Sequence, residues 1–147
     1  MNHPDMPVAA RLIGAAGLLP SLAMLLLLAA GARGFALSFG PAYGALIASF
    51  IGGAWWGLAV LRSSGEALPG WLAVAVLPTL LAWVALMLPP ATALLLLGLI
   101  FALLPLADRQ AHQSTMTVSW WMSLRMPLSA AMAVIHTLSA LILIARG

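Results

Sequence analysis

The chain has 147 residues, of which 64% are hydrophobic and only 6% are charged. Soluble globular domains carry about 25% charged residues, so lipid must cover most of the surface of this protein. Six arginines and three acids leave a net charge of +3, which is too small and too scattered to indicate nucleic-acid binding. The absence of cysteine excludes disulfides, thiolate nucleophiles and cysteine metal sites.

Five segments have the length and composition of membrane helices. A membrane-spanning helix needs about 20 mostly apolar residues, because the hydrocarbon core of a bilayer is about 30 Å thick. The sequence therefore predicts an all-α fold, a polytopic membrane helix bundle with about five transmembrane helices in a single domain. The predicted spans are 9–31, 41–61, 68–88, 91–107 and 125–145.

The first span is expected to stay in the mature protein. Asp5 precedes Arg11, and the apolar run that follows is long for the core of a cleaved signal peptide. Pro89 and Pro90 then separate the third and fourth spans, because two consecutive prolines do not continue a helix. The fourth span is short, so it either crosses the bilayer fully or forms a re-entrant segment.

The only long polar stretch is 108–124, between the fourth and fifth spans. It contains Trp120 and Trp121, and tryptophans favour the headgroup level of a membrane. We expect this stretch, with Arg125 just after it, either to lie at the membrane interface or to extend the fifth helix beyond the apolar core.

Arg125 has two plausible roles at the start of the fifth span. Its side chain either extends to the lipid headgroups or pairs with Asp108 or Glu66, which we place on the same side of the membrane. An ion pair would fix how the fifth helix enters the bundle.

The arginines predict the orientation of the bundle. With five spans, the N-terminus shares a membrane side with the second-to-third and fourth-to-fifth connections. The arginines on that side are Arg11, Arg62, Arg109 and Arg125, against two on the other side. The positive-inside rule then places the N-terminus in the cytoplasm.

The second span carries small residues at a spacing of four. Small residues let helix backbones approach closely, which is how helices pack where lipid offers no hydrophobic driving force. We therefore expect this helix at the centre of the bundle, and leave open whether its small faces contact the same chain or another one. The predicted packing residues are Gly44, Ala45, Ala48, Ser49, Gly52, Gly53 and Gly57.

Three side chains are candidates for a cofactor or ligand site. Trp55 and Trp56 near the end of the second span are either interfacial anchors or stacking walls for a quinone, lipid or pigment. His136 lies near the middle of the fifth span, where an ionisable group is a functional candidate. It serves either in packing and hydrogen bonding, or as an axial ligand or proton relay.

The sequence contains no recognisable catalytic arrangement. It has no Ser/His/Asp order with a glycine elbow, no HExxH spacing and no glycine-rich phosphate loop. We place all three acids outside the spans, so we expect a protein that is not an enzyme and holds no cofactor or metal. The leading hypothesis is an accessory, assembly or scaffold subunit that packs against other membrane proteins, as in a respiratory or photosynthetic complex, or against a second copy. The alternative is a binder or carrier of a lipid, quinone or pigment.

Four stretches carry a family resemblance: LIGAAGLLP at 12–20, YGALIASFIGGAWWGLA at 43–59, LPTLLAW at 77–83 and LRMPLS at 124–129. In this order they resemble a family of small bacterial inner-membrane proteins of unknown function that includes the mitochondrial transmembrane protein 69. The resemblance implies a multi-pass protein of the bacterial inner membrane and names no reaction. The family pattern often has a histidine before the Trp-Gly pair of the second span, where this chain has Trp55.

Overall fold

The computed structural model describes residues 6–146, so Asp5 lies outside the described residues. Within that range the fold is all-α, and five helical spans are long and apolar enough to cross a membrane. The predicted fold class is therefore confirmed, and the chain is a multi-pass membrane protein. The helices are α1 (Val8–Ala16), α2 (Leu19–Ala29), α3 (Arg33–Arg62), α4 (Ala67–Leu86), α5 (Pro90–Gln113) and α6 (Trp121–Arg146).

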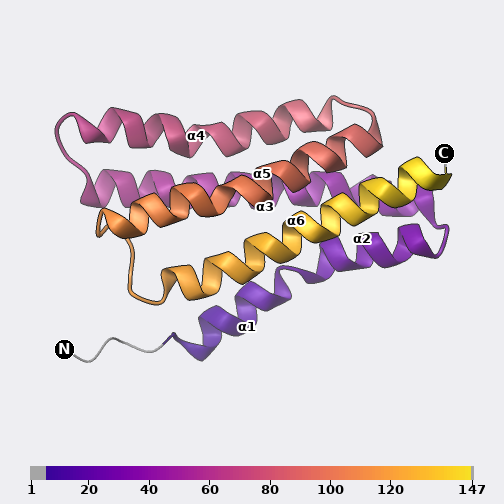
Figure 1. Cartoon of the computed structure of the whole chain (residues 1–147), viewed down its shortest axis with the longest axis horizontal. Coiled ribbons are helices and arrows are strands. Elements are labelled where there is room, and N and C mark those ends of the chain that lie inside the picture. Colours follow the sequence, from indigo (N-terminus) through magenta and orange to yellow (C-terminus); the bar gives the residue numbers. More distant parts are fainter. Residues whose placement is uncertain (1–5, 147) are drawn as a thin grey trace.

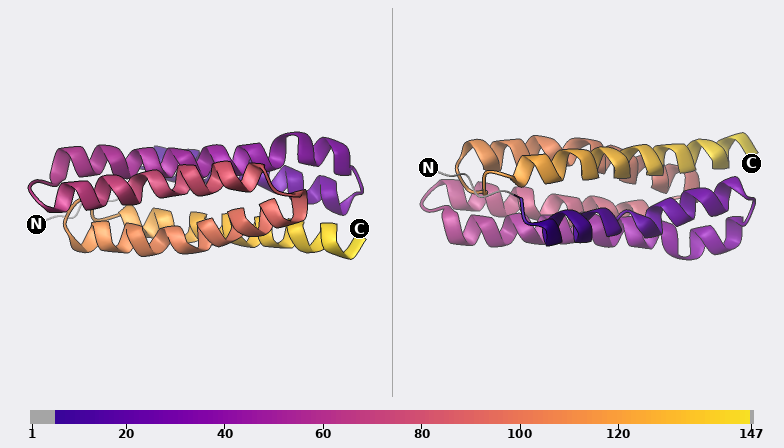
Figure 2. Two further views of the ribbon diagram at one scale, coloured as in Figure 1. Left: turned by 90° about the horizontal axis from the view of Figure 1, so that it is seen from above. Right: turned by 90° about the horizontal axis from the view of Figure 1, so that it is seen from below.

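Two antiparallel helix pairs form most of the bundle. Helix α3 packs along α4, and α5 packs along α6, while α2 lies against both α3 and α6 (Figures 1 and 2). The start of α1, the α3–α4 connection and the α5–α6 connection lie at one end of the bundle, which we call the N-terminal end (Figure 1). The α2–α3 and α4–α5 connections and the end of α6 lie at the opposite end.

The first span is broken into α1 and α2 at Gly17 and Leu18, which belong to neither helix. Pro20 has no N–H, so the helical hydrogen bond to the carbonyl of Ala16 cannot form there. The hydroxyl of Tyr43 in α3 donates a hydrogen bond of 2.7 Å to the carbonyl oxygen of Gly17. A neighbouring helix thus satisfies a backbone acceptor at the break, which is how broken helices are tolerated inside membranes.

Helix α5 is longer than the apolar pattern predicts. It runs for 24 residues, which corresponds to about 36 Å at 1.5 Å per residue and is sufficient to cross a bilayer. Residues 108–113 belong to this helix, and only 114–120 form the connection to α6. The charged and amide side chains near the start of the polar stretch interrupt the apolar pattern and so predict a connection, but these residues lengthen α5.

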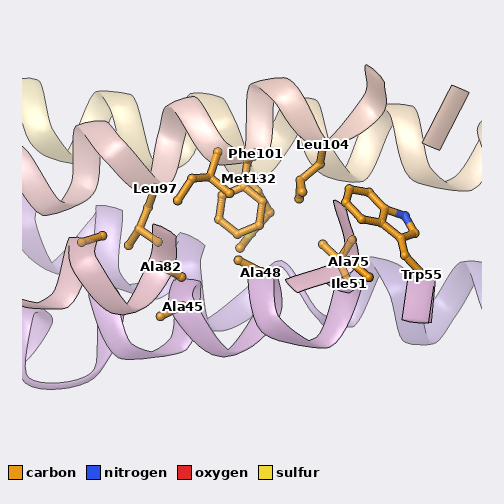
Figure 3. Close-up of a cluster of buried hydrophobic side chains, with 12 residues drawn as sticks. Ala45, Ala48, Ile51, Trp55, Ala75, Ala82, Leu97, Phe101, Leu104 and Met132 are labelled. Atoms are coloured by element: carbon orange, nitrogen blue, oxygen red, sulfur yellow. The ribbon is translucent and has the colours of Figure 1, made fainter. Parts of the chain in front are cut away.

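Phe101 lies at the centre of the core. Its side chain is fully buried and occupies the space between α3, α5 and α6 (Figure 3). Ala45 and Ala48 of α3 and Met132 of α6 pack in the same cluster. The small alanines let α3 approach α5 closely, and the large ring of Phe101 fills the remaining volume.

Close contacts surround one face of α3, which packs against α2, α4 and α5. A Cβ added at Gly40 would meet Met24 of α2, and one at Gly44 would meet the imidazole of His136 in α6. A Cβ at Gly52 would meet a backbone carbonyl of α4. Gly52 requires glycine because a backbone atom occupies the space for a methyl group, whereas at Gly40 and Gly44 a neighbouring side chain would have to shift.

The other predicted packing positions on α3 do not all face the core. Ala45 and Ala48 are buried, Ser49 is half-buried, and Gly53 is exposed. A Cβ added at Gly53 or Gly57 would meet no atom within 4 Å. Of the two alternatives left open for these small residues, contact within the chain therefore does not apply to Gly53 among residues 6–146. Spacing alone predicts packing for both small rows, because it does not distinguish the inner from the outer face of a helix.

Candidate functional site

Asp108 is the acceptor of a hydrogen-bonded cluster that joins three helices. Its carboxylate is fully buried in α5. The indole N–H of Trp55 in α3 donates to Oδ1 at 2.9 Å, and that of Trp121 in α6 donates to the same oxygen at 2.8 Å. The Nε of Arg125 in α6 donates to Oδ2 at 2.9 Å and forms an ion pair. We call these four residues the Asp108 cluster.

The helical repeat of α5 directs the Asp108 carboxylate inwards. Leu94, Leu97, Phe101 and Leu104 are buried at alternating spacings of three and four, and Asp108 continues that stripe. Trp121 and Arg125 are four residues apart on α6, so their side chains lie on the same face of that helix. The expectation that every acid lies outside the helical spans is wrong for Asp108, whose carboxylate occupies a core position.

The cluster resolves the open question about Arg125, which pairs with Asp108 and not with Glu66. Removing two charges from water is costly, and good geometry with further hydrogen bonds offsets that cost. Oδ1 accepts two N–H donors and Oδ2 accepts one, so the carboxylate is well satisfied. The guanidinium is less so, because its buried Nη2 has no partner among residues 6–146.

Trp55, Trp56 and His136 do not form a common site. Trp55 is only 2% exposed and belongs to the Asp108 cluster, whereas Trp56 is 46% exposed on the outside of the bundle. His136 lies against Gly44. Gly44 and Trp55 are 11 residues apart on α3, which corresponds to about 16 Å along the helix.

His136 is enclosed by protein at the level of Gly44. Its Nδ1 lies 2.8 Å from the carbonyl oxygen of Met132, so Nδ1 carries the proton in that hydrogen bond. Its ring packs at 40° to Phe101, with the centroids 5.2 Å apart. Nε2 is buried without a partner in the described part of the chain. Among residues 6–146, no three His, Asp or Glu side chains lie close enough together to hold a metal ion.

Tryptophans gather at the N-terminal end of the bundle. Trp121 begins α6 and donates to Asp108, while Trp120 is half-buried in the preceding connection. Trp55 and Trp56 lie in the last two turns of α3, and Trp71 lies in the second turn of α4. Tryptophans at one level along the helices are typical of the headgroup region.

An apolar groove beside the Asp108 cluster was not predicted. It has a volume of about 310 Å³ and lies between the α1–α2 break, α3 and α6, with Phe101 of α5 at its base. Arg125 and Ser129 also line it. The sequence offered one pointer, because Arg125 and Ser129 are four residues apart and therefore share one face of α6.

Comparison with known proteins places the chain in a family. Residues 6–141 match a family model described as "Protein of unknown function (DUF3429)". The chain belongs to the DUF3429 family. This confirms the resemblance inferred from the four sequence motifs.

The DUF3429 chain is also similar to "Transmembrane protein 69" of Xenopus tropicalis. The two are 39% identical over 107 residues, a region that covers 67% of this chain and 42% of the relative. The aligned region thus spans less than half the length of that relative. No solved structure matches the chain.

Proposed function

We propose that this DUF3429 protein is a non-enzymatic accessory subunit that packs against a transmembrane helix of another membrane protein through the outer face of α3. The observation that carries the proposal is the outward row formed by Ser49, Gly53 and Gly57. Gly53 and Gly57 have open space where a Cβ would lie. We call this row the outer α3 row.

The composition of the outer α3 row suits a helix contact. Small residues four apart form a shallow channel along which a second helix approaches closely, and that approach gives van der Waals contact and weak Cα–H hydrogen bonds. Phe50 and Trp56, which are 74% and 46% exposed, flank the row. Large side chains beside a small-residue channel give a partner helix both a groove and edges to pack against.

The Asp108 cluster supports a structural role over a catalytic one. A catalytic carboxylate must reach a substrate proton or a reacting atom. The Asp108 carboxylate has no exposed surface, and both of its oxygens accept hydrogen bonds from side chains of the same chain. It connects α3, α5 and α6 and so stabilises the scaffold that presents the outer α3 row.

We infer that the protein lies in a bacterial inner membrane with its N-terminus in the cytoplasm. The inference rests on the family resemblance and on the positive-inside rule. Four arginines, Arg11, Arg62, Arg109 and Arg125, belong to the N-terminal end. At the opposite end, Arg146 is engaged by the carbonyl oxygens of Leu28 and Ala29.

The test is extraction of the tagged chain in a mild detergent, followed by mass spectrometry of the purified complex. We expect one membrane protein in a fixed ratio to the chain. Gly53→Leu should abolish its capture without changing the thermal stability of the chain, because open space surrounds Gly53. Gly34→Leu is the matched control, because Gly34 is an open glycine on the same helix but outside the row.

Two kinds of result from this experiment would contradict the proposal. Equal capture by wild type and the Gly53→Leu variant would contradict the role of the outer α3 row. Recovery of the chain alone, or as a complex of two copies only, would contradict the accessory role.

A further inference from the structure

We propose that the apolar groove between the α1–α2 break, α3 and α6 binds one acyl chain of an anionic phospholipid, with the lipid phosphate on Arg125. This site shares no residue with the outer α3 row itself, although Phe50 borders both. The groove opens sideways to the membrane, because Ile13 of α1 and Phe50 of α3 line it and are 73% and 74% exposed. A lipid therefore enters it directly from the bilayer.

Two buried polar atoms along the groove lack a partner among residues 6–146. One is Nη2 of Arg125, and the other is Oγ of Ser129, one helical turn further along α6. A buried donor without an acceptor costs free energy, more so when it is charged. A ligand that presents oxygen acceptors at both positions removes that cost. The phosphate of a phospholipid fits Arg125, and the ester carbonyl below it fits Ser129.

The position of Arg125 along the bundle matches the level of lipid phosphates. Trp121 begins α6, and Arg125 follows it by about one turn, at about 6 Å along the helix axis. The tryptophans around this level mark the headgroup region, as described above. The groove continues from Arg125 past Ser129 and Met132, towards the middle of the membrane. A lipid seated there has its phosphate and its acyl chain at their usual depths.

Charge favours an anionic lipid over a zwitterionic one. The described residues at the N-terminal end include four arginines and two acids, Glu66 and Asp108. The Asp108 charge is already satisfied by two indole N–H groups and by Nε of Arg125. The remaining guanidinium donors are therefore directed to another acceptor, as in the basic sites between transmembrane helices that bind anionic lipids.

The size of the groove favours a single chain over a bulky cofactor. A volume of about 310 Å³ is at the lower end of the range for ligand sites. Its walls are almost entirely aliphatic and aromatic, which suits an acyl chain. His136 does not line the groove, so the site offers no imidazole to a haem or chlorophyll metal.

The test is native mass spectrometry of the full chain in a neutral detergent. The probes are phosphatidylglycerol and phosphatidylcholine with identical acyl chains, added separately and in competition. We expect one phosphatidylglycerol per chain, retained in preference to phosphatidylcholine. Equal binding of the two lipids would overturn the head-group assignment, and binding of neither would overturn the site.

Two variants locate the lipid. Ile47→Trp fills the groove without touching the ion pair and should weaken phosphatidylglycerol binding about tenfold or more. Leu46→Trp is its control, because Leu46 is exposed on the same helix and does not line the groove. Equal binding by the Ile47→Trp and Leu46→Trp variants would overturn the proposal.

A double substitution and a matched control variant test the contact between Arg125 and the lipid phosphate. Arg125→Gln combined with Asp108→Asn removes both charges of the ion pair together and leaves no buried charge unpaired. We expect the preference for phosphatidylglycerol to fall about tenfold, as for loss of a charged hydrogen bond. Arg109→Gln removes a charge from the exposed face of α5 and should preserve the preference. An equal loss of the preference for phosphatidylglycerol in the Arg109→Gln variant would show a general effect of charge. That result would overturn the assignment of Arg125 as the phosphate contact.

The Ser129 contact supplies a variant that leaves every charge in place. Ser129→Ala should weaken lipid binding several-fold, because it removes one neutral donor from the groove. Ser139→Ala is the control, because Ser139 is a buried hydroxyl of α6 that does not line the groove. Equal effects of these two substitutions would contradict the role given to Ser129.

Discussion

Arg125 and Asp108 form an ion pair in which Nε lies 2.9 Å from Oδ2, across the α5–α6 interface. The two residues are 17 positions apart in sequence. Asp108 lies in α5 and Arg125 in α6, on either side of the α5–α6 connection. Because Trp55 adds α3 to the same carboxylate, one acid determines how three helices meet at the N-terminal end.

Asp108→Ala should strongly destabilise the bundle. The substitution leaves the guanidinium of Arg125, which is 12% exposed, without its counter-charge. Loss of one partner from a buried ion pair costs about 3–5 kcal/mol. Thermal unfolding in detergent, followed by circular dichroism, measures the change. Glu66→Ala, at an exposed acid before α4, is the control and should change stability by less than about 0.5 kcal/mol. Similar effects of the two substitutions would contradict the role of the Asp108 cluster.

The two adjacent tryptophans of α3 should respond differently to the same substitution. Trp55→Phe removes the indole N–H that donates to Asp108, and a hydrogen bond to a charged group contributes about 1.5–3 kcal/mol. Trp56→Phe should change stability by less than about 0.5 kcal/mol, because Trp56 is 46% exposed and has no such acceptor in the described structure. Chemical unfolding of both variants in the same detergent gives the comparison. Equal losses would show that Trp55 serves only as an interfacial anchor.

Gly44→Ala should destabilise the contact between α3 and α6. The added methyl group would overlap the imidazole of His136, and overpacking a core costs about 1–3 kcal/mol. Gly53→Ala, nine residues further along α3, should be almost neutral. In a double-mutant cycle with His136→Ala, the Gly44→Ala penalty should shrink, because the smaller side chain makes room for the methyl group. An unchanged penalty would contradict this contact.

Tyr43→Phe should loosen the break between α1 and α2. The hydroxyl of Tyr43 donates to the carbonyl of Gly17, and removal of a neutral hydrogen bond costs about 1 kcal/mol. Because the effect is local, hydrogen exchange should rise around residues 14–18 more than in α5 or α6. Ser38→Ala is the control, because the Ser38 hydroxyl bonds to Phe35 in the exposed start of α3. If hydrogen exchange rose equally along the whole chain, or equally around residues 14–18 in both variants, the local role of Tyr43 would be contradicted.

Apolar length was enough to predict the class of fold. The runs of about 20 apolar residues predict helices that cross a bilayer, because a backbone in lipid must satisfy its own hydrogen bonds. The proline pair at 89–90 separated two of these runs correctly, since α4 ends at Leu86 and α5 begins at Pro90. Helix α5 ends six residues later than the apolar pattern predicts, because a helix can continue past its apolar section into charged residues.

The helix faces were harder to predict. Both small rows of α3 have the same spacing, and only the positions of α2, α4 and α6 show that the row of Gly40, Gly44, Ala48 and Gly52 is inside. The outer α3 row has the same spacing, but no atom of residues 6–146 lies within 4 Å of a Cβ added at Gly53 or Gly57. The residue types determine where another helix backbone could approach α3 closely. The arrangement of the other helices determines at which of these positions such an approach occurs.

The sequence by itself determined that this protein lies in a membrane as a bundle of five helical spans, because hydrophobicity and length are local properties of the chain. It also identified Arg125 and its two candidate acids. Only the tertiary structure decided that Asp108 is the partner, that Trp55 and Trp121 share its carboxylate, and that a groove lies beside them. Those features depend on side chains from α3, α5 and α6 meeting in space, and the distance between them is a property of helix packing that no single segment of sequence contains.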